Sequence, residues 1–185
     1  MNSFNRILVT GGAGFIGGSL IRRLLNNTNS IIFNIDNLNY ASDLISINNL
    51  KNAKGRHFHL NVNLQNIEKT QEAIKESNPD IIFHLAAESH VDRSILEPKI
   101  FIDSNIMGTF NLLEASRSHW ENLSSERKEN FKFIHISTDE VFGSLNESEK
   151  FNEDTKYDPR SPYSASKAAS DHLAKAWFNT YKIPK

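Results

Sequence analysis

Short apolar runs alternate with segments of helical periodicity along the chain. Five runs predict β-strands, because each is apolar, short and bounded by polar or turn-forming residues. They are Arg6–Thr10, Ile31–Asp36, His57–Val62, Asp80–Ala86 and Phe131–Ser137. The segments between them carry apolar residues three and four positions apart, which predicts amphipathic helices. These are Phe15–Asn26, Asp43–Leu50, Asn66–Ser77, Asp103–Arg117 and a last helix, Pro162–Tyr181, with proline in its first turn.

Strand alternating with helix predicts an α/β fold, a doubly wound parallel sheet covered on both faces. The 185 residues suffice for one domain and are too few for two. Two polar segments, Glu121–Asn130 and Gly143–Pro162, are predicted to be surface loops. The second carries four acidic residues between Glu147 and Asp154.

Charge and composition exclude several classes of function. The formal net charge is -1, so the chain has no general attraction to nucleic acid or to an anionic membrane. Cysteine is absent, which excludes disulfides and thiolate metal sites, and the seven histidines show no ligand spacing, so no metal is predicted. The polar start, Met1–Arg6, lacks the apolar length of a signal peptide, and no apolar run approaches the ~20 residues of a membrane span. These features predict a cytoplasmic protein.

A glycine motif lies between the first predicted strand and the first predicted helix. Gly11, Gly14 and Gly17 have the spacing G-x-x-G-x-x-G. Such glycines permit a tight turn and a close backbone approach to a pyrophosphate, and the following helix N-terminus offers free N–H groups to the phosphates. A glycine-rich turn alone is weak evidence, but the strand before it and the helix after it are the context that dinucleotide binding requires.

Asp36 ends the second predicted strand, roughly 20 residues after the motif. A carboxylate there can accept hydrogen bonds from both hydroxyls of the adenosine ribose, and it would repel a 2′-phosphate. An aspartate that only formed a turn or capped a helix would have no reason to lie at this distance from a glycine motif. The pattern therefore predicts a Rossmann-type domain whose cofactor is NAD rather than NADP.

Tyr163 and Lys167 lie four residues apart on the last predicted helix, so they share one helical face. A neighbouring ammonium stabilises a phenolate and is expected to lower the pKa of Tyr163 toward the working pH. Such a tyrosine can remove a proton from a hydroxyl while hydride leaves to NAD. The spacing is common, and on its own it fits an exposed tyrosine and lysine equally well.

The fifth predicted strand leads directly into Ser137, Thr138, Asp139 and Glu140. Ligands of open parallel sheets bind at the carboxyl ends of the strands. Two adjacent carboxyl groups in one pocket suggest an acid and a base, one protonated and one ionised, as the elimination of water needs. Standing alone, the segment is better explained as a helix cap with two solvated acids.

Four segments together resemble the dTDP-glucose 4,6-dehydratase family, part of the extended short-chain dehydrogenases/reductases. They are TGGAGFIG after the first strand, HLAAESHVDRSI at 84–95, STDEVFG at 137–143 and SPYSASKAASDHLAKAW at 161–177. The second segment and the TDE run are specific to sugar-nucleotide dehydratases, whereas the glycine motif and Tyr-x-x-x-Lys occur throughout the superfamily. The resemblance extends from Arg6 to the last residue.

The resemblance implies a reaction in three stages on dTDP-glucose, in deoxysugar biosynthesis such as that of dTDP-rhamnose. Tyr163, tuned by Lys167, acts as the base while bound NAD+ oxidises carbon 4 of the sugar, and Thr138 hydrogen-bonds the oxygen on that carbon. Glu140 then removes the acidified proton at carbon 5, and Asp139 protonates the hydroxyl that leaves carbon 6. The stored hydride returns to carbon 6, which yields dTDP-4-keto-6-deoxyglucose and water.

The resemblance also implies which residues contact the cofactor. Ser89 and Thr138 are expected at the substrate as well. Beside Gly11, Gly14, Gly17, Tyr163 and Lys167, the implied cofactor contacts are Phe15, Ile16, Asp36, Asn37, Leu38, Asn39, Asn63, Leu64, Leu85, Ala86, Ala87, Ser89 and Ser104.

Three positions depart from the family pattern. Asn63 stands where the family usually has an aspartate near the adenine; its amide oxygen can still accept from the adenine amine, so weaker rather than lost binding is expected. Ser104 stands in place of a cofactor-contacting threonine. Phe142 replaces a tyrosine, with no expected catalytic consequence.

The family continues for a region nearly as long again. Residues 1–185 are therefore expected to be an NAD-binding domain with the catalytic residues, without the substrate domain and with little or no turnover alone. A homodimer is expected for the full-length protein, with helices around 103–118 and 162–181 at the interface, although core packing explains their apolar faces equally well.

Two alternatives remain open at this stage. The first is another sugar-nucleotide enzyme, such as an epimerase, which needs no Asp139–Glu140 pair, or a GDP-mannose dehydratase. The second is a non-catalytic NAD-binding remnant.

Overall fold

A five-stranded parallel sheet forms the centre of the molecule in the computed structural model, which describes residues 4–146, 148 and 150–184. The strand order is β3-β2-β1-β4-β5, and every neighbouring pair is parallel. The strands are β1 Arg6–Thr10, β2 Ile31–Ile35, β3 His57–Leu60, β4 Ile81–His84 and β5 Lys132–His135. The predicted doubly wound α/β fold is confirmed.

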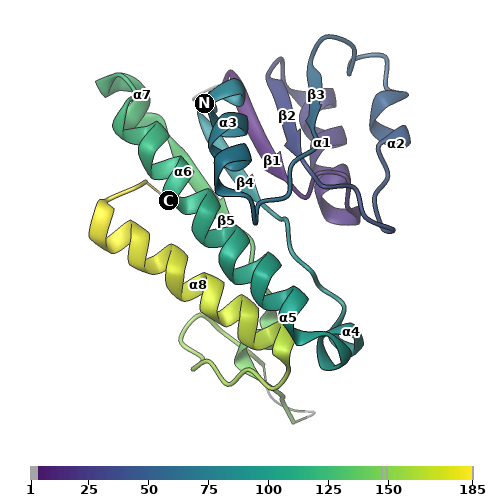
Figure 1. Ribbon diagram of the computed structural model, residues 1–185, viewed down its shortest axis with the longest axis vertical. Helices are drawn as coiled ribbons and strands as arrows, with labels where there is room; N and C mark the ends of the chain where they lie inside the picture. The colour runs from purple at the N-terminus through teal and green to yellow at the C-terminus, as the bar shows by residue number, and fades with distance from the viewer. Residues whose placement is uncertain (1–3, 147, 149, 185) are drawn as a thin grey trace.

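Helices cover both faces of this sheet (Figure 1). α1 and α2 lie on one side, while α3, α6 and α8 lie on the other, with α6 packed between α3 and α8. The α-helices are α1 Phe15–Asn27, α2 Ile45–Asn48, α3 Ile67–Ser77, α4 Val91–Leu96, α5 Pro98–Phe101, α6 Gly108–Glu121, α7 Ser125–Asn130 and α8 Pro162–Tyr181. A π-helical segment, η1 Ile102–Met107, joins α5 to α6, and a 3-10 helix, η2 Asp139–Phe142, follows β5.

Each face of the sheet has its own hydrophobic core. Along β1, Leu8 packs with Leu112 and Phe133 on the α3–α6–α8 side, whereas Ile7 and Val9 pack on the α1–α2 side. Because side chains alternate between the two faces of a strand, both faces of β1 need apolar residues. This explains why the sequence shows continuous apolar runs rather than alternation.

The boundaries differ from the prediction in several places. The predicted helix Asp43–Leu50 is helical only over Ile45–Asn48. The predicted loop Glu121–Asn130 is wrong, because α6 extends to Glu121 and α7 occupies Ser125–Asn130. The predicted helix Asp103–Arg117 begins inside the π-helical segment, after two short helices that the sequence did not predict. Within 143–161 the described residues form no helix or strand, as predicted; Glu147 and Glu149 lie outside the described residues.

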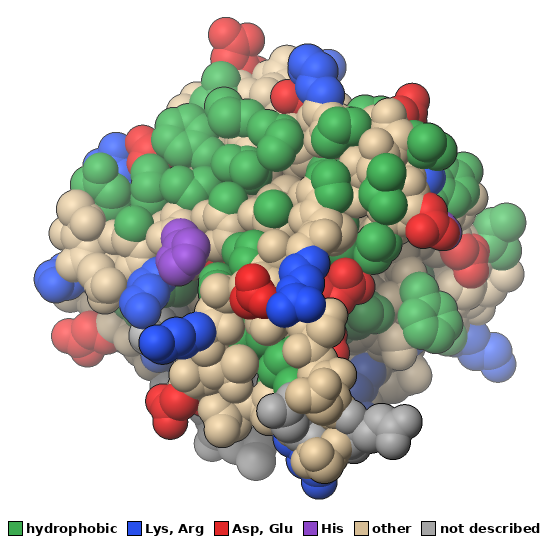
Figure 2. Space-filling view, turned by 90° about the horizontal axis from the view of Figure 1, so that it is seen from below, with side chains coloured by type: hydrophobic (Ala, Val, Ile, Leu, Met, Phe, Trp, Pro, Cys, Tyr) green, Lys and Arg blue, Asp and Glu red, His purple; other side chains and the backbone are tan. Residues whose placement is uncertain are grey.

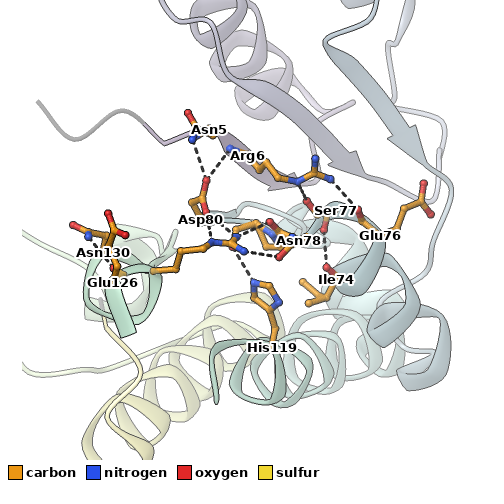
Figure 3. A network of polar contacts seen from close by, with 12 residues as sticks. Asn5, Arg6, Ile74, Glu76, Ser77, Asn78, Asp80, His119, Glu126 and Asn130 are labelled. Carbon is orange, nitrogen blue, oxygen red and sulfur yellow. Dashed lines mark hydrogen bonds and ion pairs between the residues drawn. The ribbon is translucent and has the colours of Figure 1, made fainter. Parts of the chain in front are cut away.

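α7 has no buried residue, so its position depends on polar contacts rather than on an apolar stripe. Figure 3 shows these contacts at the amino ends of the strands. Asp80 accepts hydrogen bonds from the backbone N–H groups of Asn5 and Arg6, both at 3.0 Å, and from Nε of Arg127 at 2.9 Å. The same guanidinium donates to the side-chain and backbone oxygens of Asn78. A single ion pair thus joins α7 to β1 and to the α3–β4 turn, at the edge of the sheet away from the cavity described below.

Among residues 4–146, 148 and 150–184, no helix combines the length and the hydropathy that a membrane-spanning helix needs. The same ranges contain no cluster of three or more His, Asp or Glu side chains that could hold a metal ion.

Candidate active site

A cavity of about 470 Å³ opens at the carboxyl ends of the strands. Its volume lies within the usual range for small-molecule sites. The predicted cofactor contacts meet here although they come from distant parts of the sequence. Those that line the cavity are Gly11, Gly14, Phe15, Ile16, Gly17, Asp36, Asn37, Asn39, Asn63, Leu64, Leu85, Ala86, Ala87, Ser89, Ser104, Tyr163 and Lys167.

Leu38 is the predicted contact that does not line the cavity. Its backbone has a positive φ of 53° and the residue is exposed, while its N–H donates to Oδ1 of Asp36 at 2.9 Å. The backbone of Leu38 therefore helps to orient Asp36, which does line the cavity.

The glycine turn has no room for side chains at two of its positions. A Cβ on Gly17 would lie 2.2 Å from the carbonyl oxygen of Gly11. Gly11 has a φ of +69°, and a Cβ on it would lie 2.7 Å from the backbone nitrogen of Ala86. The turn is thus pressed against α1 and against the end of β4, which brings its backbone to the cavity wall.

α1 begins at this turn without a side-chain cap, since its N-cap residue is Gly14. The first N–H groups of a helix have no partner within the helix, and they carry part of the positive end of the helix dipole. At the cavity wall these groups form a site suited to a phosphate or pyrophosphate.

Asp36 stands at the end of β2, where two backbone donors orient its carboxylate. Oδ2 accepts from N–H of Ala13 at 3.0 Å, and Oδ1 accepts from N–H of Leu38. A carboxylate offers about four acceptor sites; Oδ1 also accepts from the hydroxyl of Ser42 at 3.4 Å, so Oδ2 is the oxygen that retains a site for a ligand. The residue both braces the glycine turn and presents an acceptor to the cavity.

Tyr163 and Lys167 line the opposite end of the cavity, on the first turns of α8. Tyr163 is 8% exposed. Burial raises the pKa of Tyr163, as do the carboxylates of Glu140 and Asp139, whereas a hydrogen bond with Thr138 lowers it. Burial also lowers the pKa of Lys167, whose Nζ donates to the carbonyl oxygen of Ile136 at 2.6 Å.

The prediction that Lys167 lowers the pKa of Tyr163 is therefore wrong for this structure. The two side chains do share one helical face, as the spacing predicted. Burial and the neighbouring carboxylates raise the pKa of the phenol, and the ammonium of Lys167 is held by a backbone oxygen just after β5.

Thr138, Asp139 and Glu140 lie beside the cavity rather than in its lining. Thr138 caps η2, with its hydroxyl accepting from N–H of Glu140 at 3.3 Å. The hydrogen bond between Thr138 and Tyr163, and the effect of both carboxylates on the phenol, show that this segment faces Tyr163. The structure therefore brings three predicted catalytic residues, Thr138, Asp139 and Glu140, to the phenol of a fourth, Tyr163.

Sequence reasoning missed Asn105, which lies in the π-helical segment and is 1% exposed. Its Oδ1 accepts from N–H of Glu88, and its Nδ2 donates to the carbonyl oxygen of Glu88 and to the hydroxyl of Ser166. Asn105 thus joins the loop after β4 to the turn of α8 that carries Lys167. An asparagine inside an apolar helical pattern is the signal that could have indicated it, since a buried amide needs partners. π-Helical turns occur frequently at functional sites.

Asp171 was also missed, although it follows Lys167 by one helical turn. Its carboxylate accepts hydrogen bonds from Nε2 of His135 at 3.0 Å, from the hydroxyl of Ser137 at 2.5 Å and from the hydroxyl of Tyr157 at 2.9 Å. Burial alone would raise the pKa of Asp171, but these hydrogen bonds lower it. Ser137 lines the cavity, so Asp171 anchors one part of its wall.

Comparison with known proteins finds matches along nearly the whole chain. The profile of the family described as GDP-mannose 4,6 dehydratase matches residues 8–185. A probable dTDP-glucose 4,6-dehydratase of Sinorhizobium fredii is 50% identical over 179 residues, which cover 97% of this chain and 51% of that protein. The chain spans about half the length of the curated relatives it matches.

Solved structures of this class have the same fold. The dTDP-glucose 4,6-dehydratase of Bacillus anthracis in complex with NAD has a TM-score of 0.80 and 36% identity, covering 96% of this chain and 52% of that one. The UDP-glucose 4-epimerase of Thermus thermophilus, also in complex with NAD, has a TM-score of 0.82 and 30% identity, covering 96% of this chain and 52% of that one. The resemblance seen in the sequence is confirmed.

Proposed function

Because the chain belongs to the family described as GDP-mannose 4,6 dehydratase, we propose that it is the NAD-binding part of a dehydratase acting on dTDP-glucose. The observation that carries the proposal is the meeting of the glycine turn, Asp36 and the Tyr163–Lys167 pair in one cavity, with the acidic segment 138–140 beside the phenol. The choice of dTDP-glucose over GDP-mannose is supported by relatives named dTDP-glucose 4,6-dehydratase at 48–50% identity.

The residues of the cavity fit NAD. The uncapped N-terminus of α1 and the glycine turn would hold the pyrophosphate. Asp36 would hold the adenosine ribose, and Tyr163 with Lys167 would lie at the nicotinamide end. When bound, NAD supplies the acceptor for a hydride and later returns that hydride.

In this proposal, Tyr163 removes the proton from the hydroxyl on carbon 4 of the sugar. Thr138, already the hydrogen-bond partner of the phenol, holds the oxygen on that carbon. Lys167 is fixed by the carbonyl of Ile136, and in this proposal its positive charge would stabilise the phenolate as that forms. Leu85, Ala86, Ala87 and Ser89 form the wall beside the reacting ring and the sugar.

A ketone at carbon 4 makes the proton on carbon 5 acidic, and the two carboxyl groups of η2 then act. Glu140 takes the proton from carbon 5, and Asp139 gives a proton to the hydroxyl that leaves carbon 6 as water. Return of the hydride to carbon 6, together with return of the proton from Glu140 to carbon 5, leaves a 4-keto-6-deoxy sugar and regenerates NAD+.

We also propose that residues 1–185 form the NAD-binding domain of a longer protein whose substrate domain lies outside this chain. This protein would be cytoplasmic and would act in a pathway such as dTDP-rhamnose synthesis. The full-length protein would be a homodimer joined through helices around 103–118 and 162–181. Large hydrophobic side chains are exposed near their start, including Leu96 at 81% and Met107 at 45%. Figure 2 shows hydrophobic side chains gathered over a broad area of one face, and such areas are typical of interfaces.

Mass spectrometry of the reaction products tests the function. The full-length protein and the 185-residue chain are each incubated with NAD+ and dTDP-glucose, with Tyr163→Phe as the control. The expected result is a product lighter by one water from the full-length protein and little or none from the short chain. A product of unchanged mass would identify an epimerase, and NAD binding without any turnover by the full-length protein would identify a binding module.

The intact mass of the protein made in its own source tests the proposal of a longer chain. A mass well above 21.0 kDa is expected. A mass near that value would refute the proposal and would direct the search to a partner chain that supplies the substrate domain.

A further inference from the structure

The end of the cavity farthest along the sheet from Tyr163 is formed by residues that follow β2 and β3. Asp36 and Asn37 follow β2, and Asn63 and Leu64 follow β3. Since β3 is the outermost strand on this side, a dinucleotide whose reacting ring lies at Tyr163 and whose ribose lies at Asp36 has its base beside Asn63.

The amide of Asn63 is held in one orientation. Its Oδ1 accepts a hydrogen bond from the backbone N–H of Gln65 at 3.0 Å, and its own carbonyl oxygen accepts from N–H of Asn66 at 2.9 Å. This hydrogen bond turns Oδ1 toward the backbone of the turn and uses one of its two acceptor sites. The Nδ2 group, which can only donate hydrogen bonds, is left for a ligand.

The surroundings of Asn63 are also rich in donors. A second, shallow hollow adjoins the cavity here, lined by Asn37, Asn61, Asn63, Gln65, Asn66 and Lys69. None of these residues carries a negative charge. The hollow beside Asn63 therefore offers amides and an ammonium, and the carboxylate at this end of the cavity belongs to Asp36, which follows β2.

We propose that Asn63 reads the edge of the base as a hydrogen-bond donor, so that the site accepts a purine with an oxygen at position 6 at least as well as adenine. Adenine presents an amine there, which needs an acceptor, whereas hypoxanthine presents a carbonyl oxygen, which needs a donor. A carboxylate at this position would favour adenine and repel the oxygen. This inference rests on the proposed NAD site and concerns its selectivity for the base.

Binding calorimetry with NAD+ and with nicotinamide hypoxanthine dinucleotide tests the inference on the 185-residue chain. The wild type is expected to bind the hypoxanthine form with an affinity equal to or above that for NAD+. Asn63→Asp retains an acceptor for the N–H of Gln65, so the turn is kept, and this variant is expected to shift the ratio of the two dissociation constants about tenfold toward NAD+.

Gln71→Glu is the matched control, because Gln71 is exposed on α3 and lines neither the cavity nor the hollow. It adds the same charge nearby and is expected to leave the ratio unchanged. If the wild type binds NAD+ tenfold more tightly than the hypoxanthine form, and Asn63→Asp shows the same preference, the inference is wrong but the proposed NAD site is still supported. Absence of binding of either dinucleotide overturns the NAD site and the inference together.

Discussion

Replacing Gly17 by alanine tests the geometry of the glycine turn, and Gly18 next to it provides the control. Both are buried residues in the first turn of α1. Alanine is favoured over glycine inside a helix by about 1 kcal/mol, so helix propensity alone predicts that both substitutions stabilise the protein. If one substitution stabilises the protein and the other destabilises it, the difference must come from the atoms that the new methyl group contacts.

The structure gives the two methyl groups very different neighbours. On Gly17 the Cβ would lie 2.2 Å from the oxygen of Gly11 and 2.8 Å from Cα of Gly12, both backbone atoms that cannot rotate away. On Gly18 the nearest atom is Nη1 of Arg22 at 3.2 Å, the end of a flexible side chain. Overpacking of this kind costs about 1–3 kcal/mol, and the Gly17 contact belongs near the upper end because the turn must move by about 1 Å.

We therefore expect Gly17→Ala to destabilise the chain by about 2 kcal/mol and Gly18→Ala to stabilise it by about 0.5–1 kcal/mol. Thermal melting followed by circular dichroism measures this, and for a chain of this size the two midpoints should differ by roughly 5–10 °C. Gly17→Ala should also weaken NAD binding more than tenfold, whereas Gly18→Ala should not. If both variants melt together above the wild type, the turn does not press on α1 and the argument for a pyrophosphate cradle fails.

Three further predictions concern charges. Asp36→Asn should weaken NAD binding about tenfold and narrow its preference over NADP, because a neutral amide replaces the ionised acceptor of the ribose hydroxyls; unchanged calorimetric affinities for both cofactors would exclude this role of Asp36. Asp171→Asn should lower the pKa of His135, since burial already lowers that pKa and the Asp171 charge opposes the effect; an NMR titration that shows no change would contradict it. His84 is fully buried between Thr10 and Thr109 with a pKa well below 6.5, so it stays neutral in the folded state while the unfolded chain binds a proton. The free energy of unfolding should thus be highest above pH 6.5 and should fall on acidification, by up to about 1.4 kcal/mol per pH unit for this histidine. Urea unfolding at pH 7.5 and pH 5.5 measures this, and equal midpoints at the two pH values would refute the prediction.

The sequence by itself determined the features that depend on local pattern. The buried strands of a parallel sheet require apolar residues on both faces, so they stand out as runs. α8 was predicted with its observed bounds because a proline in the first turn is typical of a helix start. The glycine turn and Asp36 were also visible, since their residue types and spacing are required by the backbone of a strand–turn–helix unit. α7 was missed because it has no apolar stripe, and its position depends on Arg127 reaching Asp80 across the fold.

Only the tertiary structure decided how the reactive groups are arranged and charged. Spacing placed Tyr163 and Lys167 on one face of a helix. The direction in which the pKa of Tyr163 shifts, however, depends on burial and on the carboxylates of η2. The roles of Asn105 and Asp171 depend on partners 17 to 61 and 14 to 36 positions away in the sequence, respectively. Pattern analysis detects periodicity within a segment, whereas hydrogen bonding and desolvation depend on distances between segments, which exist only after the chain has folded.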